Sequence, residues 1–210
     1  MMRRPLSWTK RRLALLLAGA IATAGLWVIG DTFIEDDNFR VVDADLYRSG
    51  QLRSDEWPES YAEHPYRSVL NLRGAGPDRS WYQLERAFAD QHGLVHYDVR
   101  MSANKQPSLE DMGRLVALMG SAPKPLLIHC KNGSDRSGLA AAVYRFAVEG
   151  EPATVAERQL SLWFGHFPWL TSRTGAMDRA LAAYVAAMAR QADSGRLPPR
   201  PFAQTEVAPS

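Results

Sequence analysis

Cysteine is nearly absent from this chain, whose 210 residues include one, at position 130. A single thiol excludes an internal disulfide and any zinc site built from several cysteines, so this thiol is either inert packing or a reactive group. The chain also lacks a basic excess, because its net charge is +2 and five of its 25 basic residues precede position 13. Without those five, 20 basic residues face 23 acidic ones, which argues against a nucleic-acid partner.

One long run without charge sets the first thirty residues apart. Leu13–Gly30 reads LALLLAGAIATAGLWVIG, which is just longer than the roughly 17 residues that a helix needs to cross the hydrocarbon core. It follows five basic residues: Arg3, Arg4, Lys10, Arg11 and Arg12. By the positive-inside rule, we predict a single-pass membrane protein in which residues 1–30 form a basic cytoplasmic segment and a transmembrane helix, with the rest exported to the periplasm or the extracellular side. A signal peptide cleaved at Ala22-Thr23-Ala24 is the alternative, and a buried helix is a third interpretation.

From residue 38 onward, short β-branched runs alternate with amphipathic stretches, a pattern typical of an α/β layer fold. The apolar run at 126–128 is too short for a helix and predicts a central strand. Other strands are expected at 39–42, 46–48, 68–72 and 94–101. Helices are expected at 78–93, where Glu85 would lie on the polar face, and at 108–119, 136–148, 152–163 and 174–190. The proline-rich tail, 194–210, is predicted to be disordered.

The segment around the cysteine carries the clearest chemistry. Residues 128–139 read IHCKNGSDRSGL, in which an apolar strand is followed by Cys130, five further residues, Arg136 and the start of a helix. A free thiol with a pKa of about 8.5 is mostly protonated at neutral pH, but N–H groups at a helix N-terminus favour its thiolate. The same N–H groups are suited to hold phosphoryl oxygens. The residues expected to bind phosphate are Lys131, Asn132, Gly133, Ser134, Asp135 and Arg136.

Further residues complete the predicted site. The planar fork of Arg136 suits two phosphoryl oxygens, and Ser137 is placed to donate to the sulfur when it becomes the leaving group. Gly133 allows a backbone conformation that is costly for other residues, and Gly138 allows close packing of the helix. A buried strand-end thiol beside an exposed arginine is the plainer interpretation, but it does not account for a glycine loop and a helix start at the same place.

The frame His129-Cys130-x5-Arg136-Ser137-Gly138 resembles the signature of the protein tyrosine phosphatase superfamily. LYRSGQ at 46–51 and VLNLRG at 69–74 resemble its compact dual-specificity branch. The resemblance covers residues 38–190 and implies a phosphatase domain over that range. It further implies a mostly parallel central sheet flanked by helices, a phosphocysteine intermediate, and neither a metal nor an organic cofactor.

The resemblance is incomplete at the proton donor. The superfamily normally supplies an aspartate from the loop after the strand that ends near Met101, but this sequence has Asn104 near that place. An amide cannot protonate a leaving group. Asp135 is the first candidate for the general acid, followed by Asp98 and Asp111, and a reaction without a carboxylic acid also stays open. Asp135 has a plainer interpretation too, as a salt bridge that orients the loop.

These observations predict an enzyme that hydrolyses phosphate monoesters, with Cys130, Arg136, Asp135 and Ser137 as catalytic residues. Its substrate is expected to be phosphotyrosine in a protein or the headgroup of a phospholipid, since a membrane anchor would hold the enzyme beside either. Arg73 and Arg79, which flank a turn at the end of a strand, are further candidates to contact substrate. The alternative function is a catalytically impaired module that binds phosphorylated ligands. The missing loop aspartate favours that alternative, and the intact cysteine argues against it.

Overall fold

The computed structural model describes residues 8–30, 37–168 and 173–194. The chain divides into two units, Met1–Asp36 and Asp37–Ser210, which are described separately. The tail predicted to be disordered lies, from residue 195 onward, outside the described residues.

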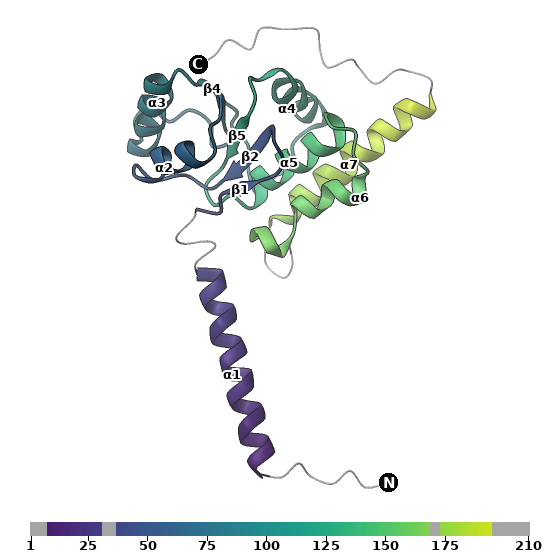
Figure 1. The fold of residues 1–210 in the computed structure, drawn as a ribbon. Coiled ribbons are helices and arrows are strands. Elements are labelled where there is room, and N and C mark those ends of the chain that lie inside the picture. Colours follow the sequence, from purple (N-terminus) through teal and green to yellow (C-terminus); the bar gives the residue numbers. More distant parts are fainter. Residues whose placement is uncertain (1–7, 31–36, 169–172, 195–210) are drawn as a thin grey trace. The chain divides into compact units, whose positions relative to one another are not determined.

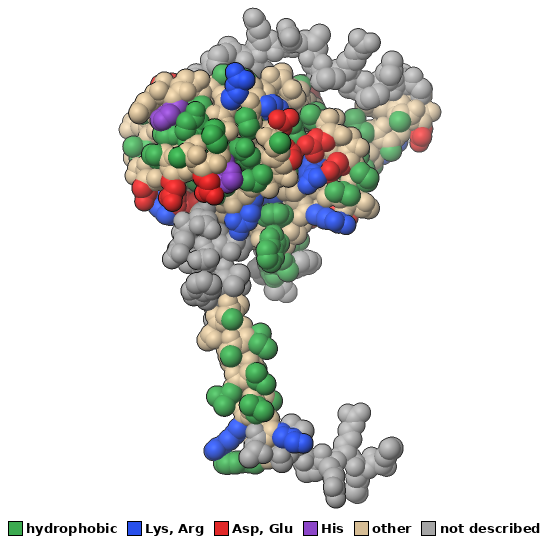
Figure 2. Space-filling model, in the orientation of Figure 1, with side chains coloured by type: hydrophobic (Ala, Val, Ile, Leu, Met, Phe, Trp, Pro, Cys, Tyr) green, Lys and Arg blue, Asp and Glu red, His purple; other side chains and the backbone are tan. Residues whose placement is uncertain are grey.

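The described part of the first unit is the helix α1 (Trp8–Gly30). Figure 2 shows basic side chains at one end of it and hydrophobic side chains along the rest. The predicted transmembrane helix is wrong, because no helix in the described ranges is long and apolar enough to cross a membrane. Half of Leu13–Gly30 is alanine, glycine or threonine, whose side chains carry little apolar surface. The anchor, the membrane contact and the exported location that depended on this helix are overturned with it.

A five-stranded sheet in the order β1-β2-β5-β3-β4 forms the centre of the second unit (Figure 1). Its strands are β1 (Arg40–Val41), β2 (Leu46–Ser49), β3 (Ser68–Asn71), β4 (Val95–Asp98) and β5 (Leu126–His129). β1 and β2, two of the predicted strands, pair in antiparallel fashion, whereas β2, β5, β3 and β4 pair in parallel. The central place of β5 and the mixed α/β fold agree with the sequence prediction.

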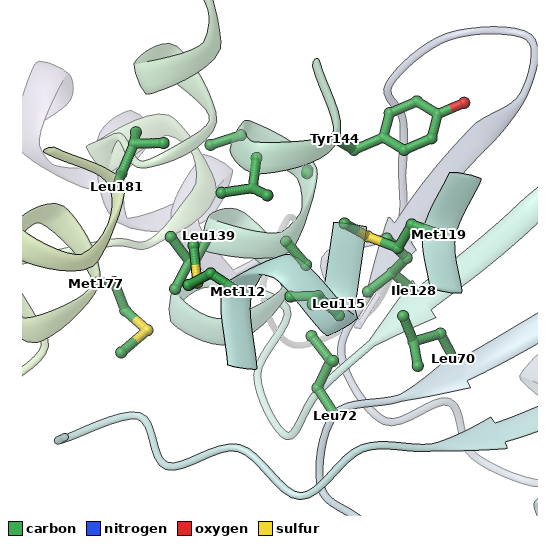
Figure 3. Packing of buried hydrophobic residues seen from close by; sticks show 14 of the residues in the cluster. Leu70, Leu72, Met112, Leu115, Met119, Ile128, Leu139, Tyr144, Met177 and Leu181 are labelled. Atoms are coloured by element: carbon green, nitrogen blue, oxygen red, sulfur yellow. The ribbon is translucent and has the colours of Figure 1, made fainter. Parts of the chain in front are cut away.

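Alternate side chains of the strands enter two cores, one on each face of the sheet. From β5, Leu126 and Ile128 enter the larger core and Leu127 enters the smaller one. Figure 3 shows Leu70 and Ile128 of the sheet facing helix residues of the larger core. Residues of the larger core come from α4 (Leu109–Ser121), α5 (Asp135–Ala147) and α7 (Gly175–Asp193), and those of the smaller one from α2 (Glu56–Glu63) and α3 (Ser80–His92).

Local signals set some of the helix boundaries. Ser108 and Asp111 form a capping box at the start of α4, and α3 ends at Gly93, whose φ of 63° is in the left-handed region. The helix predicted to start at 78 starts later, because α3 begins one residue after Arg79, whose side chain makes no capping hydrogen bond.

The single helix predicted over 152–163 is also wrong. The chain instead forms α6 (Ala153–Ala156) and the 3₁₀ turns η2 (Glu157–Gln159) and η3 (Leu162–Phe164). The carbonyl oxygen of Gln159 accepts a hydrogen bond of 2.8 Å from the buried guanidinium of Arg48, and Leu160 leaves the helical region. A tertiary contact therefore overrides the local helix preference of this segment.

Helix α5 packs closely against this irregular segment through Gly138, as predicted. A Cβ atom at Gly138 would lie 2.9 Å from the carbonyl oxygen of Gln159 and 3.1 Å from Nη2 of Arg48. Because one of these neighbours is backbone and the other is held by several hydrogen bonds, neither can move away easily.

We expect Gly138→Ala to lower the free energy of unfolding by about 1–3 kcal/mol, because overpacking outweighs the gain of up to about 1 kcal/mol in helix propensity. The matched control is Gly120→Ala in α4, where the added Cβ meets nothing within 4 Å. That change should stabilise the protein by up to about 1 kcal/mol. Urea unfolding of both variants measures the difference, and stabilisation by both would contradict the packing described.

Candidate active site

The 130–136 loop leads from the carboxyl end of β5 into α5, at the edge where the parallel strands of the sheet end. Cys130 follows β5 directly, and its N–H donates to the carbonyl oxygen of Ser49 at 3.3 Å. The N–H of Gln51 donates to the carbonyl oxygen of Lys131 at 3.2 Å. The N–H of Leu72 donates to the carbonyl oxygen of His129 at 2.9 Å. Backbone hydrogen bonds from the ends of both neighbouring strands therefore hold the carboxyl end of β5 and the start of the loop in register.

Gly133 gives the loop its tight course. Its φ is +69°, and a Cβ atom there would lie 2.7 Å from the backbone nitrogen of Gly50. Any other residue would strain the backbone and collide with the strand end. This agrees with the conformational role predicted for Gly133.

The thiol of Cys130 is buried at the bottom of this loop, with 2% of the residue exposed. Burial alone would raise its pKa, but the guanidinium of Arg136, the hydroxyl of Ser137 and the backbone N–H groups of Ser137 and Asn132 lower it below the usual value. The Oγ atom of Ser137 lies 3.5 Å from the sulfur. The site is therefore built to favour a thiolate.

Backbone carbonyl groups hold the guanidinium of Arg136. Its Nη1 atom donates to the carbonyl oxygens of Leu72 and Met101, at 3.2 and 3.3 Å. Its Nε atom is buried and has no hydrogen-bond partner among the residues that the structure describes. The guanidinium thus keeps a buried donor for an additional acceptor, beside a buried sulfur.

Arg48, which sequence reasoning missed, braces the loop from below. Its buried guanidinium donates to the carbonyl oxygens of Gly133 and Ser134, at 2.8 and 3.0 Å. It also donates to the carbonyl and side-chain oxygens of Gln159, at 2.8 and 2.9 Å. Burial lowers the pKa of Arg48 to about 10, and the Cys130 thiolate opposes that change. Arg48 therefore stays charged at neutral pH and adds positive potential near the thiolate.

A buried carboxylate, Glu85 of α3, supports the other side of the loop. Its Oε1 atom lies 3.0 Å from Nε2 of His129 and 2.6 Å from Nε2 of His96, and its Oε2 atom accepts from Gln51 at 3.0 Å. Burial acts to raise the pKa of Glu85 and to lower that of His129, but their mutual contact outweighs burial in both cases. The prediction that Glu85 lies on the polar face of its helix is wrong. Glu85 is three residues from both Tyr82 and Phe88, which are buried, and this spacing places it on the buried face.

Arg73 brings a second guanidinium to the site. It stacks on the ring of Trp81 at 3.5 Å, and its Nη1 atom donates to Oε1 of Gln51 at 2.7 Å. Burial and the charge of Arg136 lower the pKa of Arg73, while Glu85 and the Cys130 thiolate raise it. Arg79, by contrast, is exposed at the start of α3. Of this predicted pair, Arg73 is the one whose charge is coupled to the thiol.

Two of the carboxylates considered as general acid are engaged elsewhere. Asp98 ends β4 and accepts hydrogen bonds from Tyr82 at 2.5 Å and from Asn71 at 2.7 Å. Asp111 is exposed and caps α4, where its hydrogen bonds with Ser108 lower its pKa. Asn104 is exposed in the loop after β4. Each of the two carboxylates therefore has a structural explanation of its own.

Asp135, the remaining candidate, is bound to a histidine. Its Oδ1 atom lies 2.8 Å from Nδ1 of His166, whose Nε2 atom lies 2.9 Å from Oδ2 of Asp178 in α7. The side chain of Asp135 is 20% exposed. Among the other residues expected to bind phosphate, Lys131 and Asn132 are exposed, whereas Gly133 and Ser134 are buried.

Comparison with known proteins identifies the family of this site. Residues 27–166 match the family described as DSP-PTPase phosphatase fused to NAD+ kinase. The chain belongs to this dual-specificity phosphatase family. The match covers more than half of the chain and confirms the resemblance to the compact dual-specificity branch, whose members are cysteine-dependent phosphatases.

Individual relatives of this dual-specificity phosphatase are distant. The inositol diphosphatase SIW14 of Saccharomyces cerevisiae is 28% identical over 116 residues, which are 53% of this chain and 40% of that relative. The chain thus matches less than half of the relative's length. Among solved structures, P. aeruginosa TpbA has a TM-score of 0.57 at 21% identity, over 74% of this chain and 92% of that one. The catalytic core of SIW14 has a TM-score of 0.55 at 20% identity, over 77% and 95%. At such identities the likeness shows a shared fold.

The brace formed by Arg48 can be tested in this phosphatase directly. We expect Arg48→Met to lower the free energy of unfolding by on the order of 3 kcal/mol, because four buried acceptors lose their charged donor. Arg67→Met is the matched control, since Arg67 is exposed and surface substitutions usually change stability by less than about 0.5 kcal/mol. Thermal and urea unfolding of both variants give the comparison, and equal stability would show that Arg48 is not a brace.

Proposed function

We propose that this chain hydrolyses phosphate monoesters through a phosphocysteine intermediate on Cys130. The observation that carries the proposal is a buried thiol with a lowered pKa, next to an arginine whose buried Nε atom has no partner within the described part of the chain. A phosphoryl group suits this arrangement. The thiolate can attack its phosphorus, and its oxygens can accept hydrogen bonds from the guanidinium.

The proposed reaction has two steps. The thiolate of Cys130 attacks phosphorus, the bond to the ester oxygen breaks, and that oxygen leaves with a proton from an acid. Water then attacks phosphorus, the bond to sulfur breaks, and phosphate departs. In this second step Ser137, 3.5 Å from the sulfur, stabilises the thiolate that leaves. Arg136 and the N–H groups of residues 131–136 hold the phosphoryl oxygens throughout.

Asp135 is our proposal for the acid. It adjoins Arg136 in the loop and is partly exposed, whereas Asp98 and Asp111 are engaged in structural hydrogen bonds. Its contact with His166 also supports the plainer role, a bridge that orients the loop. The two roles make different predictions for different leaving groups.

Phosphotyrosine in a protein is the first substrate class that we propose. One structural neighbour, a TpbA variant, was solved in complex with phosphotyrosine. A phospholipid headgroup loses its main support, because that proposal depended on the membrane anchor. The impaired phosphate-binding module is also less favoured, since a buried sulfur with a lowered pKa and a neighbouring hydroxyl is more than phosphate binding requires.

An inositol diphosphate, whose terminal phosphoryl group is joined by an anhydride instead of an ester bond, is the second candidate substrate, and the leaving group favours it. A phosphate that leaves from a diphosphate has a conjugate acid of pKa about 6, against about 10 for the phenol of tyrosine. Such a group departs with little help from an acid, which suits a site that has Asn104 near the usual place of the loop aspartate. The exposed Lys131 and the guanidinium of Arg73 also suit a densely charged substrate. The yeast relative is named as an inositol diphosphatase.

Cys130→Ser should abolish turnover of every substrate, because an alcohol is barely ionised where a thiolate is stabilised. Arg136→Lys should lower kcat/KM by more than tenfold, since an ammonium cannot make the two-pronged contact. Turnover is measured on a phosphotyrosyl peptide, a phosphoseryl peptide, a short-chain phospholipid and an inositol diphosphate, with Arg67→Lys as the control. A wild-type chain that binds these compounds without turnover would favour the phosphate-binding module instead.

Asp135→Asn separates the two roles of that carboxylate. If Asp135 is the acid, we expect the rate of hydrolysis of alkyl phosphates to fall by about 10²- to 10⁴-fold. The rate on nitrophenyl phosphate should change little, because its leaving group departs as an anion. The measurement is the dependence of rate on leaving-group pKa. An equal loss for both substrates would leave Asp135 only the bridging role. Asp98→Asn and Asp111→Asn, tested alongside, should lower stability without changing that dependence.

A further inference from the structure

His166 lies buried between two carboxylates that come from different helices. Its Nδ1 atom is 2.8 Å from Asp135, at the start of α5, and its Nε2 atom is 2.9 Å from Asp178, in α7. An ionised carboxylate can only accept hydrogen bonds, so both ring nitrogens must carry hydrogen. With both carboxylates ionised, the geometry therefore requires a positively charged imidazolium.

The surroundings of His166 keep that charge in place. α5 contributes Asp135 and α7 contributes Asp178, while Arg48 of β2, which lies 4.5 Å from the ring of Phe164, is electrostatically coupled to Asp135. Burial acts to lower the pKa of His166, but the two carboxylates raise it above its usual value. The bridge between two ionised carboxylates therefore places a protonated ring within hydrogen-bond distance of the loop.

We propose that His166 is a positioning residue, which fixes the carboxyl group of Asp135 at the 130–136 loop and stores the proton that Asp135 passes to the leaving oxygen. This inference rests on the proposed function. An ordinary aspartic acid titrates near pH ~3.9 and holds almost no proton at neutral pH. Joined to a histidine, the pair holds one proton in common and can give it up.

The proton balance of the two steps is complete. In the first step the proton moves from His166 to Asp135 and then to the oxygen that leaves phosphorus, so that His166 becomes neutral and Asp135 stays ionised. In the second step the attacking water gives a proton to Asp135, which returns it to His166 as the bond from phosphorus to sulfur breaks. Asp178 stabilises the charged state of His166 without touching the substrate.

Asp178→Asn tests this inference without changing the 130–136 loop. Removing one negative charge lowers the pKa of His166, so the alkaline limb of kcat for an alkyl phosphate should move to lower pH by about one unit. The rate at acidic pH and the rate on nitrophenyl phosphate should stay within a fewfold. Asp193→Asn, on the same helix but exposed, is the matched control and should leave the limb where it is.

His166→Gln removes the stored proton itself. We expect the rate of hydrolysis of an alkyl phosphate to fall by about 10²-fold or more and its pH profile to lose the alkaline limb. The rate on nitrophenyl phosphate should fall much less. If this variant unfolds, NMR titration of the His166 ring in the wild type and in Asp178→Asn replaces it. In Asp178→Asn, the pKa of His166 from NMR and the pKa of the alkaline limb should both be lower than in the wild type.

Two results would overturn the inference. One is an NMR pKa that falls in Asp178→Asn while the alkaline limb stays fixed, since catalysis would then not use that proton. The other is an equal loss on both substrates in His166→Gln, because a bridge that only holds the loop in shape affects both alike. Hydrolysis through a phosphocysteine is tested separately, because it fails if Cys130→Ser retains turnover or if the wild-type chain binds phosphorylated compounds without turning them over.

Discussion

The stabilisation of one buried negative charge, the thiolate of Cys130, is the interaction on which the rest of this structure depends. A thiolate out of contact with water is unfavourable unless donors and positive charges surround it. Arg136, the hydroxyl of Ser137 and two backbone N–H groups provide that environment directly. They can do so only because Gly133 lets the loop turn back against Gly50 and because α5 starts at the end of the loop.

Charges alternate outward from the sulfur. Arg48 and Arg73 are electrostatically coupled to the thiolate, and at the end of β5 Glu85 and the thiolate raise the pKa of His129. Farther from the sulfur, the carboxylate of Glu85 lies on the side of α3. On the side of α7 lies the Asp135–His166–Asp178 bridge, which combines two carboxylates with a histidine. The buried carboxylate of Glu85 is thus set against two histidines and Gln51, which is the condition under which low-dielectric surroundings tolerate a charge. The same pairing ties the loop to helices from both faces of the sheet.

The fold and the centre of the site could be predicted because their signals are local. The LLI run and the frame from His129 to Gly138 predict the central strand, the loop and the helix start from adjacent residues. Contacts between distant segments could not be predicted in this way. Arg48 lies 111 residues before Gln159, and His166 lies 31 residues after Asp135, so neither contact leaves a periodic pattern in the sequence. The N-terminal prediction is wrong for another reason, since length, absence of charge and flanking basic residues do not suffice for a membrane span unless the side chains also carry enough apolar surface.

Cys130 is the one cysteine of the sequence, and this has a redox consequence. Thiolates are the form of cysteine that peroxides oxidise, and the sulfenic acid they produce is rescued most simply by a second thiol in the same protein. This chain has no second thiol to form that disulfide. Recovery of the reduced thiol therefore requires a thiol from another molecule, which acts either on the sulfenic acid itself or on the sulfenamide that forms if the acid first condenses with a neighbouring backbone nitrogen in the 130–136 loop. The burial that stabilises the thiolate also limits which reductants can reach it.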